Sequence, residues 1–177
     1  VKALIVACIF MLFYIWFRFK DIRFAGSAII ALVHDVLVML TGYALIRISV
    51  GNTFIACVLT IVGYSINDTI VIFDRIRENM QGMKKQTPET LAEVANRSLT
   101  QTLSRSLNTS ITTIIMVLLL FILGVSSIRE FALPLMIGLI SGTYSSIFIA
   151  AALWYVMKLH LGKDKLMKAA AAKTKKK

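Results

Sequence analysis

Long apolar stretches alternate with short polar segments along the whole chain. A helix that crosses a membrane needs about 20 mostly apolar residues. The fourth such stretch is the least regular, because polar residues such as Asn108 and Thr113 crowd its first half. The pattern predicts an all-α fold, a polytopic membrane helix bundle within residues 1–157. Its five transmembrane helices are expected at about residues 2–17, 24–46, 53–73, 104–123 and 131–157.

The longest polar segment, residues 74–103, follows the third apolar stretch. Within it, Thr87, Pro88 and Glu89 have the order of a helix start, with an N-cap, a proline at the first position and an acid in the first turn. Apolar residues then recur at helical spacing from Leu91 to Leu99. We therefore expect a cytoplasmic helical loop whose helix lies on the membrane surface or against a partner.

Composition and charge fit a membrane protein and give its orientation. Of the 177 residues, 58% are hydrophobic, and the mean hydropathy of +0.78 is far above that of a soluble domain. Seventeen of the 20 Lys and Arg residues fall in segments 18–23, 74–105 and 158–177. Basic segments stay on the cytoplasmic side. The basic tail 158–177 is therefore predicted to be cytoplasmic and the N-terminus extracytoplasmic, in a bacterial cell membrane.

The chain begins at Val1 without an initiator methionine. An odd number of helices with an outside N-terminus leads us to expect a fragment that lacks a preceding helix and an external domain. The basic tail is read as a solvated stop-transfer segment, with contact to anionic membrane lipids or the ribosome as the alternative. Nucleic-acid binding is not expected, because no basic residues are interleaved with exposed aromatic residues.

No pattern for enzyme chemistry is found along the chain. Cys8 and Cys57 both lie in apolar stretches and are read as packing residues. No Walker loop, Ser-His-Asp set or metal-ligand spacing occurs. We expect neither an enzyme nor a metal or other cofactor.

Asp68 stands out as a carboxyl group inside the third apolar stretch. An Asp at the centre of a membrane helix costs at least about 2.5–3.5 kcal/mol. Such a group normally faces other helices or a water-filled path, and it often binds or passes an ion. Asp68 therefore predicts a proton- or ion-coupled membrane protein, although a carboxyl that only accepts hydrogen bonds for packing is the alternative.

Polar stripes on three of the expected helices should face one another. Asn67 and Asp68 share a face of the third helix, Arg105 and Thr109 share a face of the fourth, and His34 with Asp35 lies in the second. Burial favours a neutral carboxyl while a guanidinium favours the ionised one, so an Asp68–Arg105 pair could change protonation with a small movement. We predict these six residues as the proton-coupling set. In the alternative, Arg105 extends to the membrane surface.

Small residues recur at intervals of four in the fifth stretch, at Gly138, Gly142 and Ser146. Such residues let helix backbones approach closely in lipid. We predict tight helix packing there and, in the third stretch, at Gly63.

Two segments carry a family resemblance. The run 62–79 (VGYSINDTIVIFDRIREN) and the run 98–110 (SLTQTLSRSLNTS), together with the His34-Asp35-Val36 motif, closely resemble the SecD/SecF family of protein-export membrane proteins. The Tyr-Ser-Ile-Asn-Asp part resembles the SecF branch rather than the SecD branch. The resemblance covers nearly the whole chain and fits a separate SecF or the C-terminal part of a SecDF fusion.

The resemblance implies a fold and an activity. The fold is half of a twelve-helix resistance-nodulation-division assembly, in which this chain supplies five helices of a six-helix half and SecD supplies the other half. The activity is a proton-driven pulling of polypeptide at the SecYEG translocon, with Asp68 and Arg105 at the positions of the family's membrane Asp and essential Arg. The implied partners are SecD, SecYEG, YidC, YajC, the translocating polypeptide and membrane lipids.

Two other functions stay open at this point. The same helical fold could carry a proton-coupled exporter of small molecules or lipids. A passive scaffold beside a translocon is the third possibility, although a scaffold has no need of Asp68 and Arg105 in the membrane.

Overall fold

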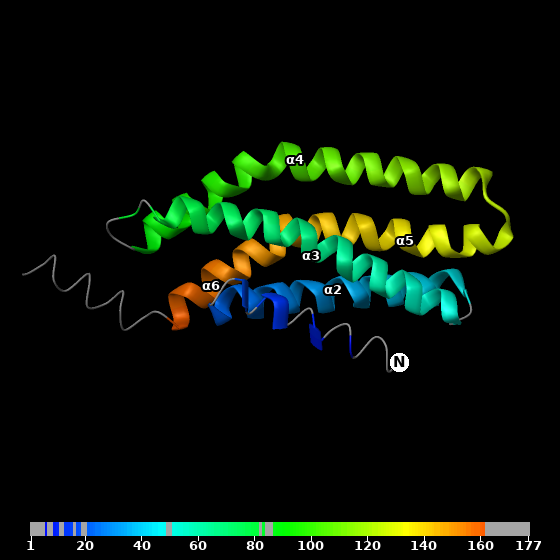
Figure 1. Cartoon of the computed structure of the whole chain (residues 1–177), viewed down its shortest axis with the longest axis horizontal. Helices are drawn as coiled ribbons and strands as arrows, with labels where there is room; N and C mark the ends of the chain where they lie inside the picture. Colours follow the sequence, from blue (N-terminus) through cyan, green and yellow to red (C-terminus); the bar gives the residue numbers. More distant parts are fainter. Residues whose placement is uncertain are drawn as a thin grey trace, which may run out of the picture.

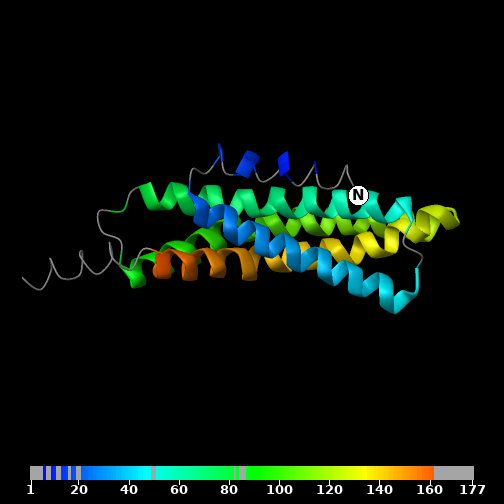
Figure 2. The same cartoon turned by 90° about the horizontal axis from the view of Figure 1, so that it is seen from below.

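The structure is a bundle of long helices (Figures 1 and 2). This computed structural model describes residues 6, 9, 10, 13–15, 17, 18, 21–48, 51–81, 83 and 87–161. The helices are α2 (Ile22–Ile46), α3 (Asn52–Gln81), α4 (Pro88–Leu123), α5 (Ser126–Tyr144), a π-helix η1 (Ser145–Ala150) and α6 (Ala151–Leu161).

The expected all-α membrane bundle is confirmed. Within the described residues, four helical segments are long and apolar enough to cross a membrane: Ile22–Ile46, Thr53–Gln81, Pro88–Leu123 and Ser126–His160. These match the second to fifth predicted spans. The first predicted span, residues 2–17, and the tail beyond residue 161 lie largely or wholly outside the described residues.

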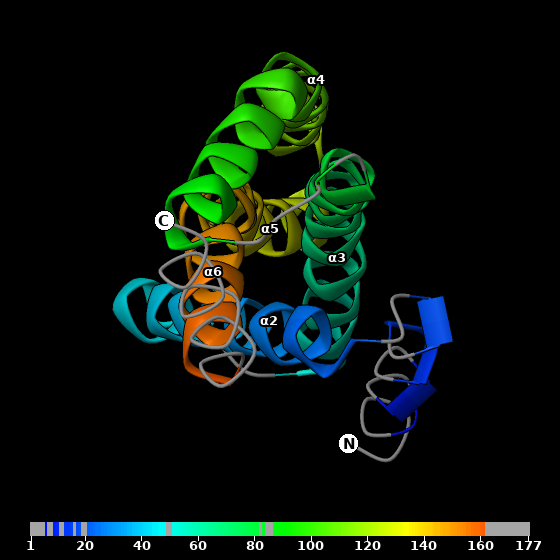
Figure 3. The same ribbon diagram turned by 90° about the vertical axis from the view of Figure 1, so that its left-hand side faces the viewer.

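Helix α5 lies in the middle of the bundle. Seen end-on, α2, α3 and α4 surround it (Figure 3). It contacts α2, α3 and α4, and η1 and α6 continue the same helical path. The start of α2, the end of α3, the start of α4 and the end of α6 lie together at one end (Figure 1). That end carries Arg23, Arg77 and Lys158, and its cytoplasmic placement stays a prediction.

The α3–α4 connection differs from the expected helical loop at residues 74–103. Helix α3 continues to Gln81, and α4 runs unbroken from Pro88, where Thr87 and Thr90 form a reciprocal cap. At 1.5 Å per residue its 36 residues measure about 54 Å, more than the roughly 30 Å of a bilayer core. Both helices therefore extend beyond the membrane as a hairpin.

Side chains across this hairpin explain why no separate surface helix forms. Arg75 bonds to Gln101, and Asn79 bonds to Ser98. Leu91, with Val94 and Ala95, belongs to the buried core instead of a membrane-facing stripe. The polar groups and the apolar face of the early part of α4 are thus satisfied within the chain.

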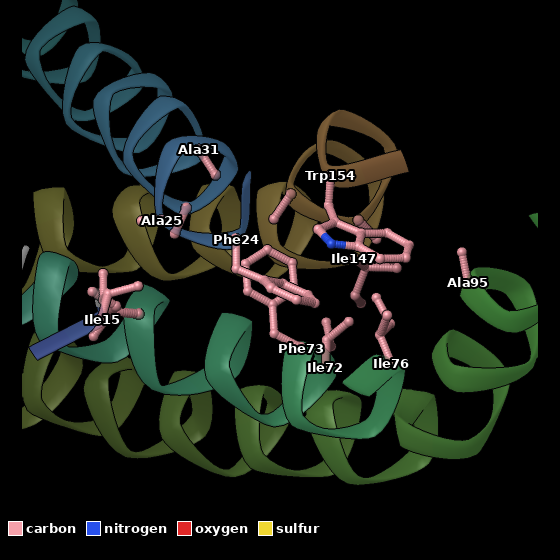
Figure 4. Close-up of a cluster of buried hydrophobic side chains, with 14 of the residues drawn as sticks. Ile15, Phe24, Ala25, Ala31, Ile72, Phe73, Ile76, Ala95, Ile147 and Trp154 are labelled. Carbon is pink, nitrogen blue, oxygen red and sulfur yellow. The ribbon is translucent and has the colours of Figure 1, made fainter. Parts of the chain in front are cut away.

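An aromatic core lies at the same end of the bundle. The Phe24 ring lies 5.3 Å from Trp154, stacked at 20°, and 5.0 Å from Phe73. Ile72 and Ile76 of α3 lie beside them (Figure 4). Large buried aromatic residues dominate core energetics. This cluster therefore fixes α2, α3 and α6 against one another.

The small residues of α5 allow close helix contact. A Cβ atom at Gly138 would overlap the Ile61 side chain of α3, and one at Gly142 would lie 3.2 Å from the Ser65 Cβ. Gly63 differs, because a Cβ there would meet no atom within 4 Å. The packing predicted for Gly63 is therefore not found, since this residue lies on a face of α3 that no described helix approaches.

The contrast between Gly138 and Gly63 gives a stability prediction. We expect Gly138→Ala to lower the free energy of unfolding by about 1–3 kcal/mol, because overpacking forces Ile61 to shift. We expect Gly63→Ala to leave it unchanged or raise it by up to about 1 kcal/mol, because alanine is the better helix former. Thermal unfolding of the full-length protein in detergent would measure both.

Ile61→Val removes the methyl group nearest to the added Cβ but keeps Cγ1, so it should restore part of the loss in the Gly138→Ala background. Equal effects of the two glycine substitutions would contradict this account of the α3–α5 contact.

Candidate functional site

Helix α3 carries four neighbouring polar side chains that bond to three different elements. The Tyr64 hydroxyl donates to Ser110 of α4 at 3.0 Å, and Ser65 donates to Asp35 of α2 at 2.6 Å. Asp68 bonds to α4, and Thr69 bonds to η1. Hydrocarbon offers no partners for such groups, so neighbouring helices must supply them. α3 is therefore the polar centre of the bundle.

Asp68 is buried and only partly satisfied. Its side chain accepts one hydrogen bond, from Ser106 Oγ to Oδ1 at 2.6 Å. Asp68 is 8% exposed, and its Oδ2 atom is buried without a hydrogen-bond partner among the described residues. An unpaired buried carboxyl oxygen is costly. Such an atom suits a group that exchanges a proton or a partner more than one that only stabilises the fold.

The predicted ion pair between Asp68 and Arg105 is not formed within the described part of the chain. Arg105 is exposed, as are Asn67 and Thr109. The Thr109 hydroxyl donates to the Arg105 carbonyl oxygen in its own helix. The face of α4 that meets Asp68 is therefore the one that carries Ser106, the residue after Arg105.

Arg105 instead lines a groove between the last turns of α3 and the first half of α4. The groove has a volume of about 430 Å³, and its lining residues are Val71, Asp74, Arg75, Glu78, Gln101, Thr102 and Arg105. Val71 follows Asp68 by one turn in α3, and Thr102 precedes Ser106 by one turn in α4. The groove thus runs from the charged end of the hairpin toward the Asp68 carboxyl.

Sequence reasoning missed the buried hydroxyl stripe of α4, from which Ser106 donates to Asp68. Ser98, Thr102, Ser106 and Ser110 are all buried and lie four residues apart, close to one helical turn. This stripe, not the one through Arg105, faces α3. The four-residue spacing of small hydroxyl residues is a signal that could have found it.

Asp35 is the centre of a second, fully bonded cluster. Its Oδ2 atom accepts from Ser65 at 2.6 Å and from Ser145 at 2.7 Å. Its Oδ1 atom accepts from Ser141 at 2.9 Å and lies 3.2 Å from His34 Nδ1. The cluster joins α2, α3, α5 and η1. Asp35 is 0% exposed, so every partner of its carboxyl comes from the protein.

Ser146 belongs to this polar layer as well as to the small-residue stripe. Its hydroxyl lies 2.9 Å from Thr69 Oγ1 and donates to the Ser65 carbonyl oxygen at 3.2 Å. It lies in η1, and π-helical segments are rare and often occur at functional sites. The predicted site residues thus divide into an Asp68 group and a His34–Asp35 group.

Metal binding has no support in the described part of the chain, where no three His, Cys, Asp or Glu side chains come together as ligands.

The described residues define a class: a polytopic membrane protein with ionisable groups buried between its helices. Such groups are characteristic of ion-coupled transport.

Comparison with known proteins gives the family. Residues 1–160 match the family described as protein export membrane protein SecD/SecF, C-terminal, and this chain belongs to that family. It is 51% identical over 154 residues to protein translocase subunit SecF of Alicyclobacillus acidocaldarius, which covers 87% of this chain and 50% of the relative. It is 45% identical to protein translocase subunit SecDF of Bacillus subtilis, over 88% of this chain and 21% of that protein.

Solved structures agree with this assignment. A crystal structure of SecDF in its super-membrane-facing form matches with a TM-score of 0.80 and 43% identity, covering 90% of this chain and 21% of that one. The chain spans about half the length of the SecF relative. The predicted family and a multi-pass membrane protein are confirmed, and both SecF and SecDF proteins are among the relatives.

The two buried carboxyls should differ in their effect on stability. We expect Asp35→Ala to lower the free energy of unfolding by at least about 2 kcal/mol more than Asp68→Ala, because each hydrogen bond to a charged group contributes about 1.5–3 kcal/mol. Both substitutions delete the same atoms. The measurement is unfolding of the full-length variants in one detergent, and an equal or larger loss for Asp68→Ala would refute the distinction.

Proposed function

We propose that this chain is the membrane part of a proton-driven auxiliary subunit of protein translocation in the bacterial cell membrane, with Asp68 as its coupling carboxyl. One observation carries the proposal: Asp68 is buried in a membrane-crossing helix with one donor and one unpaired oxygen. Membership of the SecD/SecF family supports polypeptide export as the work that is driven.

The chemistry follows from the two states of this carboxyl. An ionised Asp68 attracts the Arg105 guanidinium, which stays charged throughout, whereas a protonated Asp68 does not. Among the described residues no ion pair joins Arg105 to Asp68, and Arg105 lines the groove that leads toward the carboxyl. Movement of α4 relative to α3 would bring the guanidinium to Asp68 when the proton leaves. Proton release is thereby converted into a helix displacement.

The groove also offers a route for the proton. Its mouth carries the carboxylates of Asp74 and Glu78, and Gln101 and Thr102 lie deeper along α4. Water in a polar groove of this kind can carry protons between an interior carboxyl and the membrane surface. We assign the groove as the cytoplasmic path of the cycle, in keeping with the basic residues at this end.

An exposed polar stripe supports a SecD-type partner. Asn67 of α3 and Arg105, Asn108 and Thr109 of α4 are exposed on helices that cross the membrane. Polar groups in contact with lipid are unfavourable, so this face requires a polar protein surface. A second helical half, either separate SecD or the other half of a SecDF chain, would supply it.

The remaining partners are proposed on the family resemblance. They are the SecYEG translocon, YidC, YajC, the translocating polypeptide and membrane lipids. No catalytic or cofactor chemistry is part of the proposal. A proton-coupled exporter of small molecules or lipids would use the same Asp68 chemistry. Only its substrate would distinguish it from a subunit of protein translocation. A passive scaffold would leave the unpaired Asp68 oxygen unexplained.

Replacement of Asp68 by asparagine tests the proposal directly. Asp68→Asn keeps the shape of the side chain and an acceptor for Ser106, but it removes the titrating group. In inverted vesicles that contain the full-length protein and its partners, we expect ATP-independent completion of a trapped polypeptide to fall to the level seen without a proton gradient.

Glu130→Gln is the matched control, because it neutralises an exposed acid at the start of α5. It should leave gradient-dependent completion unchanged. If the Asp68→Asn protein inserts, pairs with its partners and still responds to the gradient, Asp68 is structural and the scaffold function gains support.

Arg105 gives an independent test of the displacement step. A lysine keeps the charge but not the planar guanidinium, whereas a glutamine has no charge. We expect Arg105→Gln to abolish gradient-dependent completion and Arg105→Lys to retain part of it. The same vesicle assay measures both, and equal completion by the two variants would argue against a role for the Arg105 charge.

A further inference from the structure

We propose that His34 and Asp35 form a second proton-binding site, and that its protonation controls how firmly η1 is held against α2. This inference rests on the proposed proton-coupled function, to which it adds a second titrating group. It starts from a buried carboxyl that the Asp68–Arg105 step does not use.

The hydrogen bonds of Asp35 match the capacity of an ionised carboxylate. Two carboxylate oxygens offer about four lone-pair sites. Ser65 and Ser145 fill those of Oδ2, and Ser141 fills one of Oδ1, with His34 filling the other when its Nδ1 carries a proton. Three of the partners are hydroxyl groups, which do not titrate in this range. His34 is the one partner that can exchange a proton with Asp35.

His34 also connects the cluster to the surface of the chain. Its side chain is 37% exposed, whereas that of Asp35 is 1% exposed. A protonated His34 can transfer its Nδ1 proton across 3.2 Å to Asp35 Oδ1. The N–H bond breaks as the O–H bond forms, the imidazolium becomes neutral imidazole, and the carboxylate becomes a carboxylic acid. Both charges disappear without loss of the contact between the two groups.

Among the described residues, the hydrogen-bond partners of Asp35 include no titratable side chain other than His34. From α3 Asp35 is faced by Ser65, from α5 by Ser141 and Gly142, and from η1 by Ser145. None of these titrates. Asp68, three residues after Ser65 on α3, bonds to Ser106 of α4 instead. Proton exchange at Asp35 therefore involves His34 among the described residues.

Ser145 is the group through which protonation would act. Its hydroxyl has a single proton and two acceptors, Asp35 Oδ2 at 2.7 Å and the Gly142 carbonyl oxygen at 3.2 Å. Hydrogen bonds to an ionised carboxylate are roughly twice as strong as neutral ones. When Asp35 becomes neutral, the Gly142 carbonyl competes with it, and Ser145 turns back into its own helix.

The position of Ser145 gives this change a structural effect. It is the first residue of η1, where the regular α5 ladder ends. Ser141 makes the same kind of bond to Asp35 one turn earlier, but it has no second acceptor among the described residues. Loss of the Ser145 bond would therefore free η1 from α2 while α5 stays attached.

A nitroxide in η1 tests the inference. Phe148 is 61% exposed, so Phe148→Cys places a spin label on this segment. The full-length protein, with its other cysteines replaced by alanine, is reconstituted in lipid bilayers and titrated from about pH 9 to about pH 5, the range in which histidine changes charge. We expect the label to become more mobile as the pH falls.

Variants fix the cause of that change. Asp35→Asn should give the mobile spectrum at every pH, because the carboxylate is absent. His34→Gln should slow the change in label mobility after a rapid pH drop, because the proton must then reach Asp35 without the His34 relay. A label whose mobility does not change with pH in the unsubstituted cluster would overturn the inference.

Ser145→Ala and Ser141→Ala are the matched pair. Each removes one hydroxyl bond to the same carboxyl. Ser145→Ala should give a mobile label at every pH, while Ser141→Ala should retain the titration. Identical behaviour of the two variants would mean that the cluster is only a packing junction, and the inference would fail.

The Asp68→Asn variant separates this inference from the proposed function. It should lose gradient-driven export yet retain the pH response of the η1 label. Export that survives Asp68→Asn would refute the proposed function while the label response still supports a proton site at Asp35. If Asp68→Asn abolishes gradient-driven export as expected but the η1 label does not respond to pH, the second site alone is refuted.

Discussion

Polar side chains on α3 must be satisfied inside a medium that supplies no hydrogen bonds, and much of the bundle follows from this constraint. Tyr64, Ser65, Asp68 and Thr69 lie on one broad face of the helix within two turns. Tyr64 and Asp68 bond to serines of α4, Ser65 bonds to Asp35 of α2, and Thr69 bonds to a serine of η1, so these three elements must present polar groups at matching heights. Glycines of α5 bring that helix close enough for its own hydroxyls to join the same layer.

The same constraint makes the two buried carboxyls unequal. Asp35 has all of its acceptor sites filled by groups from four elements, and such a network specifies one arrangement of helices. Asp68 has one donor and one unpaired oxygen on the side of the bundle where α3 and α4 expose further polar groups. The fold thus places the two carboxyls in different settings: Asp35 ties four elements together, and Asp68 keeps an oxygen that no described group bonds. The exposed stripe beside Asp68 supports the proposed second membrane half.

Much of the fold was predictable from the sequence, because apolar length determines membrane helices almost alone. The boundaries at residues 74–103 were wrong because charged residues were taken to end the helices. In fact Arg75 and Asn79 find partners across the hairpin, so α3 and α4 continue past the membrane. Asp68 was found because a carboxyl in an apolar run is unusual. The sequence does not identify Ser106 as the partner of Asp68, or Ser145 as a partner of Asp35. Serine is common in membrane helices, and tertiary packing sets the helix rotation that decides which serine meets which carboxyl. Helical spacing predicts which residues share a face of α4, and this led to the expected Asp68–Arg105 pair. Spacing does not show whether the face with Arg105 or the face with Ser106 turns toward α3.

The central claim is that Asp68 takes up and releases the proton that drives the cycle. Proton flux into liposomes, measured with an internal pH-sensitive dye, tests it most directly when the full-length protein is reconstituted with its SecD-type half. An imposed proton gradient should drive a flux of protons through the unsubstituted protein. This flux should disappear in the Asp68→Asn protein, although both proteins assemble equally. An unchanged flux in the Asp68→Asn protein would contradict the account.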